Sequence, residues 1–124
     1  MIIIWEYAMK TLFVFNEAPY GSERTYNGLR LAGVLAQQEG NAVRVFLIGD
    51  GASSAHRNQK VPQGFYSIET MLGNVIRHGG EVGTCATCME ARGMTDANLA
   101  DGVHRSTLAE LAEWTAWADK VLVF

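Results

Sequence analysis

The sequence contains little of what several protein classes require. Only two of its 124 residues are cysteines, Cys85 and Cys88, which excludes a framework of disulfide bonds. No apolar run is long enough for a membrane span, no basic cluster occurs, and the formal net charge is −3. Proteins that bind the phosphate backbone of a nucleic acid need a positively charged surface. We therefore expect neither a membrane nor a nucleic acid as a partner.

Motifs for common cofactors and for hydrolysis are also missing. The chain has no glycine-rich dinucleotide fingerprint, no phosphate-loop lysine and no serine–histidine–aspartate order. Its histidines, His56, His78 and His104, lack the close spacing of metal ligands, and a zinc site would need two ligands besides the cysteines. We therefore predict that the protein uses no cofactor and no metal.

The residues that are present indicate one compact domain. Hydrophobic residues make up 48% of the chain, and apolar runs alternate with amphipathic segments. This alternation predicts an α/β fold, with a parallel sheet and helices on both of its faces. Ser22 and Ser67 are predicted to cap the first two helices. The predicted strands are 11–15, 42–48, 80–84, 120–124 and a short one near 102–104, and the main helices are 23–38, 68–76 and 107–118.

Residues 1–8 differ from the rest of the chain. Their apolar run is too short for a signal peptide and lacks a basic start. We expect an N-terminal extension outside the native fold, with the natural start at Met9 and a single domain over 9–124; an added strand is the alternative. We expect the protein to be cytoplasmic.

Two regions suggest contacts beyond the core. The stretch up to Tyr66 is predicted to be a long polar loop at the sheet edge that carries Cys85, where His56 can reach the thiol or stay solvated. On the last helix the predicted buried face is Leu108, Leu111, Ala112, Thr115 and Ala118. This leaves Trp117 outside, which favours a subunit interface over packing on a loop.

The segment with both cysteines carries the predicted chemistry. Cys85 follows a buried strand at the start of a helical turn, where backbone N–H groups and the helix dipole favour a nucleophilic thiolate. Cys88, one turn later, can resolve a disulfide, accept sulfur or simply pack. Arg92 can hold a thiolate, a persulfide or a partner carboxylate, or form a surface ion pair. Gly21-Ser22 weakly resembles a phosphate cradle.

Several segments, taken in order, resemble the DsrE/DsrF-like family and within it the YchN type. They are Ala18-Pro19-Tyr20-Gly21-Ser22, Leu29-Arg30-Leu31-Ala32, Gly64-Phe65-Tyr66-Ser67-Ile68, Cys85-x-x-Cys88-x-x-x-Arg92-Gly93, Asp101-Gly102-Val103 and the ending from Ala118. The resemblance spans about 9–124. It implies a three-layer α/β/α fold with a mainly parallel five-stranded sheet, and a homohexamer.

The resemblance also implies a role for the first cysteine. Sulfur-relay members carry a persulfide eight residues before the glycine of an Arg-Gly pair, and that position here is Cys85. Cys88 matches the YchN type rather than the relay carriers. The leading hypothesis is therefore a persulfide carrier that meets donor and acceptor proteins. The alternatives are a Cys85/Cys88 dithiol oxidoreductase and a non-catalytic homohexameric binding or scaffold protein; a flavin or nucleotide binder is suggested by fold analogy alone.

Overall fold

One five-stranded sheet organises the protein. The computed structural model describes residues 9–124, and the expected extension at 1–8 lies outside this range. The strands lie in the order β4-β3-β2-β1-β5, and every neighbouring pair is parallel. This confirms the predicted α/β class and makes the sheet wholly parallel. The strands are β1 (Lys10–Phe15), β2 (Ala42–Leu47), β3 (Glu81–Cys85), β4 (Val103–Ser106) and β5 (Lys120–Val123).

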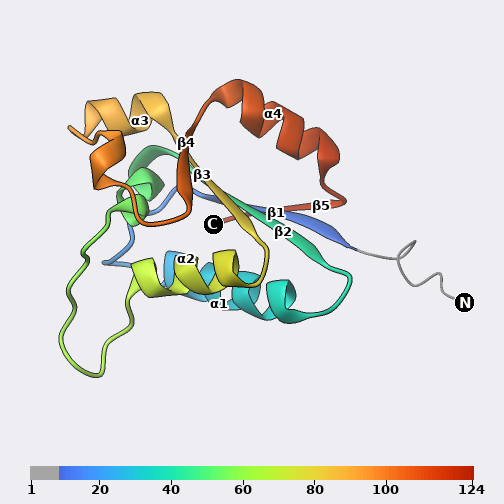
Figure 1. Ribbon diagram of the computed structural model, residues 1–124, viewed down its shortest axis with the longest axis horizontal. Helices are drawn as coiled ribbons and strands as arrows, with labels where there is room; N and C mark the ends of the chain where they lie inside the picture. The colour runs from blue at the N-terminus through green and yellow to red at the C-terminus, as the bar shows by residue number, and fades with distance from the viewer. Residues whose placement is uncertain (1–8) are drawn as a thin grey trace, which may run out of the picture.

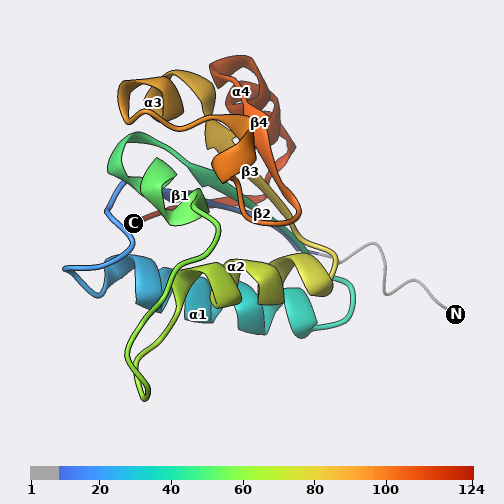
Figure 2. The same cartoon turned by 60° about the vertical axis from the view of Figure 1, so that its left-hand side comes forward.

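The helices form layers on both sides of this sheet. α1 and α2 cover one face, whereas α4 crosses the other and α3 lies on that side near its carboxyl edge (Figures 1 and 2). No helix among residues 9–124 is long and apolar enough to cross a membrane. The helices are α1 (Arg24–Gln37), α2 (Ile68–Arg77), α3 (Ala86–Ala91) and α4 (Leu108–Trp117), with short 3₁₀ helices η2 (Gly49–Ala55) and η3 (Asp96–Asn98).

The two serine caps have different outcomes. Ser67 caps α2 as predicted, because its hydroxyl accepts a hydrogen bond from the Thr70 amide at 3.3 Å. The prediction for Ser22 is wrong. Glu23 is the N-cap of α1 and its side chain makes no capping bond, while Ser22 only accepts a weak bond from the Arg24 amide at 3.4 Å. The chain enters α1 one residue later than expected.

The segment after β2 is not the uniform loop that its polarity predicted. Its first part is the buried helix η2, which passes so close to β1 that a Cβ on Gly51 would lie 2.1 Å from the Phe15 carbonyl oxygen. Small residues therefore permit the close approach that fixes this segment against the sheet. Only the stretch after η2 projects from the body as a loop (Figures 1 and 2).

The apolar core is divided unequally between the two faces. The larger cluster lies mainly between the sheet and α1 with α2, and the smaller one lies under α4. The first includes Phe13, Phe15, Leu29, Val45, Ile68, Leu72, Val75 and Val82. The second consists of Leu12, Phe46 and Trp114, with Val14, Ile48, Cys85, Leu111 and Ala118 packed against it.

The predicted buried face of α4 needs correction. Leu108 is 71% exposed, whereas Trp114 is 5% exposed and meets the Phe46 ring edge-on with centroids 6.2 Å apart. Trp117 lies against the sheet as well, because the Arg44 guanidinium stands 3.9 Å from its ring centroid. Burying a large indole removes more apolar area from water than burying Leu108 does, so Trp114 sets the rotation of the helix.

Candidate thiol site

Cys85 lies where the chain turns from strand to helix. It is the last residue of β3 and also the N-cap of α3. Its Sγ accepts a hydrogen bond from the Cys88 amide at 3.4 Å and lies 3.3 Å from the Thr87 hydroxyl oxygen. The strand–helix boundary that the sequence predicted thus places polar hydrogens around this thiol, which is half-buried and free of any disulfide.

These neighbours change the acidity of Cys85. Partial burial raises the pKa of the thiol, but hydrogen bonds from the Cys88 side chain, the Thr87 hydroxyl and both backbone amides outweigh it. The pKa of Cys85 therefore lies below the ordinary thiol value. Since the thiolate is the nucleophile, Cys85 is the more reactive of the two sulfurs.

Cys88 has the opposite character. Burial raises its pKa, and the hydrogen bond to Cys85 and the charge of Cys85 act in the same direction. The Gly49 amide, which donates to the Cys88 Sγ at 3.2 Å, and the nearby Arg92 act against this increase without cancelling it. The pair therefore consists of one thiol whose pKa is lowered and one whose pKa is raised.

Arg92 is positioned beside Cys88 rather than Cys85. Its Nη2 donates to the Asp50 Oδ1 at 2.6 Å, and its Nη1 donates to the Cys88 carbonyl at 3.1 Å. Asp50 stands at the start of η2, so the ion pair connects η2 to α3.

A small apolar pocket opens at the cysteines. Its volume is about 440 Å³. Ser106 of β4, which the sequence analysis did not select, is the register partner of Cys85 and shares this pocket. Finding it would have required the exact pairing of β3 with β4, which a four-residue strand does not reveal. The pocket is lined by Ile48, Cys85, Ala86, Thr87, Cys88, Ser106, Thr107 and Leu108.

A polar cluster continues from this pocket to the surface. The Ser106 hydroxyl donates to the Glu110 carboxylate at 2.5 Å, and the His104 ring contacts the same carboxylate oxygen. Burial raises the pKa of Glu110, but the hydrogen bonds from Ser106 and His104 outweigh it and the pKa lies below its usual range. The cluster therefore ties α4 to β4 next to the thiols.

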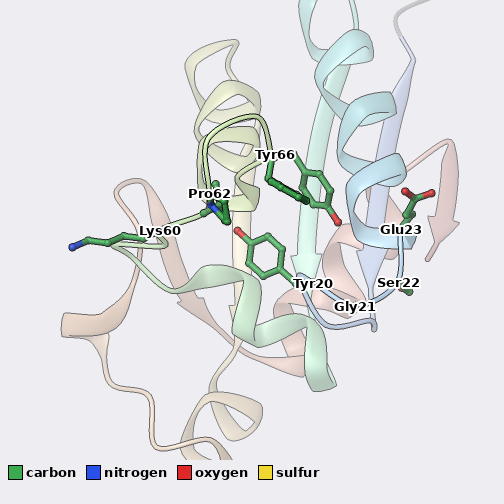
Figure 3. Close-up of a pocket in the computed structure, with 9 residues that line it drawn as sticks. Tyr20, Gly21, Ser22, Glu23, Lys60, Pro62 and Tyr66 are labelled. Atoms are coloured by element: carbon green, nitrogen blue, oxygen red, sulfur yellow. The ribbon is translucent and has the colours of Figure 1, made fainter.

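Two other predicted residues lie away from the cysteines. The backbone of His56 forms a bridge with Leu99, and within residues 9–124 its side chain neither lines the thiol pocket nor bonds to either sulfur. Ser22 lines a different pocket of about 520 Å³, in which Tyr20 and Tyr66 stack with centroids 5.9 Å apart (Figure 3). Neither side chain therefore lies beside the two thiols.

Metal-binding geometry is likewise not found at this site. Over residues 9–124, no group of three or more histidine, cysteine, aspartate or glutamate side chains is placed to hold a metal ion.

The fold and the thiol pair define a class: small, wholly parallel α/β proteins with a C-x-x-C pair at a strand–helix turn. The profile of the DsrE/DsrF-like family matches residues 9–124. The chain belongs to the DsrE/DsrF-like family, as the sequence resemblance predicted.

Relatives support this assignment over almost the whole chain. Protein YchN of Escherichia coli strain K12 is 46% identical over 116 residues, which cover 93% of this chain and 98% of YchN. The uncharacterised protein MK0008 of Methanopyrus kandleri is 37% identical and covers 90% of both chains. The crystal structure of E. coli YchN superposes with a TM-score of 0.88 at 44% identity, covering 94% of this chain and 99% of that one.

Proposed function

We propose that this protein is a sulfur carrier that holds sulfane sulfur on Cys85. The Cys85 thiolate attacks the terminal sulfur of a donor persulfide, forms a new S–S bond and releases the donor as its thiolate. Cys85 then carries the persulfide until an acceptor thiolate attacks its terminal sulfur and frees Cys85. Membership of the DsrE/DsrF-like family supports sulfur relay as the general class of function.

The observation that carries the proposal is the different acidity of two adjacent thiols. Hydrogen bonds from Thr87 and Cys88 lower the pKa of Cys85, whereas burial raises the pKa of Cys88. A carrier needs one nucleophilic sulfur with an open approach, and Cys85 lines a pocket with room for an additional sulfur atom. Arg92 supports the site through Cys88, whereas His56 and Ser22 lie away from the thiols.

The proposal includes an assembly and a location. We expect a homohexamer, as the family resemblance implies, with donor and acceptor proteins that approach the thiol edge. Apolar side chains near that edge and along β5 are exposed, including Leu108 at 71% and Val123 at 65%, and such residues suit a subunit contact. We place the protein in the cytoplasm, where reducing conditions keep both thiols free.

Intact-protein mass spectrometry tests this function after incubation with a cysteine desulfurase and cysteine. We expect the wild type at early times to gain one sulfur atom that a reductant removes, and Cys85→Ser to gain none at any time. Cys88→Ser is the matched control, since it also loses one thiol but should still gain sulfur. A wild-type chain that stays unmodified would favour the scaffold alternative, in which Cys85→Ser disturbs assembly instead.

A further inference from the structure

We propose that Cys88 is a resolving thiol that discharges the Cys85 persulfide as hydrosulfide and leaves a Cys85–Cys88 disulfide. This rests on the proposed function, because it needs sulfur on Cys85. The Cys88 thiolate attacks the Cys85 Sγ, and a bond between the two cysteine sulfurs forms. The bond from Cys85 to its terminal sulfur breaks, and that sulfur, which has taken up the proton given up by Cys88, leaves with the electron pair as HS⁻. No external oxidant is required, because the sulfane sulfur is itself reduced.

The contacts of Cys88 select which sulfur it attacks. The Cys88 amide donates to the Cys85 Sγ at 3.4 Å, and both cysteines line the same pocket. The Cys88 Sγ itself accepts a hydrogen bond from the Gly49 amide at 3.2 Å. Cys88 therefore faces the inner sulfur of the persulfide, while the pocket lined by Ile48, Ser106 and Leu108 offers space for the terminal one.

Conversion of Cys85 to a persulfide makes the Cys88 thiolate easier to form. In the free protein, the hydrogen bond and the charge of Cys85 are two of the causes that raise the pKa of Cys88. A persulfide no longer carries a thiolate on the Cys85 Sγ, so both causes weaken. The Gly49 amide and Arg92, which favour the Cys88 thiolate, remain in place. The Cys88 thiolate is thus harder to form beside a free Cys85 than beside a Cys85 persulfide.

An acceptor and Cys88 therefore compete to react with the Cys85 persulfide. An acceptor that arrives quickly takes the terminal sulfur, whereas a carrier left without an acceptor releases it as hydrosulfide and stops in the disulfide form. The reaction before this step must supply sulfane sulfur, and a dithiol reductant must return the disulfide to two thiols. The C-x-x-C pair would thereby limit how long the persulfide persists.

Single-turnover loading with inorganic polysulfide tests the inference without a partner protein. The loaded chain is freed of excess polysulfide by gel filtration, and hydrosulfide and intact mass are followed over time without reductant. The wild type should release one hydrosulfide per persulfide and end as a disulfide. Cys88→Ser should retain its sulfur about a hundredfold longer than the wild type. In the wild type the attacking thiol is fixed in the same chain and acts at a millimolar effective concentration, and the variant lacks that thiol.

The variants distinguish the two levels of the proposal. Cys88→Ala serves as a second variant in case serine disturbs the fold, which circular dichroism reports. Equal persulfide lifetimes in the wild type and the Cys88 variants would overturn the resolving role alone, whereas sulfur mapped to Cys88 would overturn both the resolving role and the assignment of the carrier to Cys85. Failure of the folded Cys88 variants to load Cys85 would overturn the carrier function and the inference with it. Rapid loss of the sulfane sulfur from the wild type, but not from the Cys88 variants, supports both the carrier function and the resolving role.

Discussion

The two faces of the sheet use the same five strands in different ways. The face under α1 and α2 packs aromatic and aliphatic side chains without interruption, and Phe13 and Phe15 on it are fully buried. The face under α4 buries only a small group around Trp114, and toward the carboxyl edge its apolar residues become half-buried or exposed. The thiols lie on this second side. The larger buried cluster therefore lies on one face of the sheet, and the thiols lie beside the smaller one on the other.

The largest expected effect comes from the well-packed face. Phe15→Ala removes a ring that stacks on Phe124 with centroids 5.4 Å apart, and we expect a loss of about 3–5 kcal/mol of unfolding free energy. Urea denaturation measures it. Leu108→Ala is the matched control on the other side, where a 71% exposed side chain should change stability by about 0.5 kcal/mol or less. Similar losses at both positions would erase the distinction between the faces.

A smaller effect is expected from the polar cluster that fixes α4. Glu110→Gln weakens the charge-assisted bonds from Ser106 and His104, at a cost of about 1–2 kcal/mol near pH 7. Because the folded-state pKa of Glu110 is lowered, its contribution is fully present above the unfolded value of about 4.3 and is lost as the pH falls through the folded value. Urea melts of both proteins from neutral to acid pH should converge. A difference that grows toward acid would contradict this.

The smallest effect on stability and the sharpest on chemistry is expected at Thr87. Cys85 should reach half its maximal alkylation rate with iodoacetamide below the ordinary thiol pKa of about 8.5, and Cys88 above it. Thr87→Ala removes a hydrogen bond to Cys85 and should raise the alkylation midpoint of that thiol. Stability should change by about 0.5 kcal/mol or less. An unchanged midpoint would show that the hydroxyl does not stabilise the thiolate.

Much of the fold could be predicted because its signals are local. The apolar run of β1 and the i, i+3, i+4 spacing in α2 each specify one element without knowledge of its neighbours. The alternation of elements then determines a parallel sheet. The predicted rotation of α4 was wrong because it depends on what Trp114 meets across the sheet, namely Phe46, and helix periodicity does not contain that information.

The site was partly predictable for the same reason. Cys85 follows from a strand that ends where a helix begins, which is visible along the chain. The ion pair of Asp50 with Arg92 and the pairing of Cys85 with Ser106 join segments that are distant in sequence. The sequence left open whether His56 reaches the thiol or stays solvated, because a loop after β2 ends at the same edge; η2 turns the chain and leads the His56 backbone to Leu99.

The pairing of β1 with β5 also bears on how the chain folds during synthesis. The Lys10 amide bonds to the Asp119 carboxylate at 2.9 Å across a separation of 109 residues. β1 lies inside the finished sheet, yet one of its edges stays open on the ribosome until β5 has been made. Contacts so distant in sequence form slowly, and an open strand edge is a template for pairing with other chains. The nascent protein is therefore most prone to aggregate before β5 emerges and covers the open edge of β1.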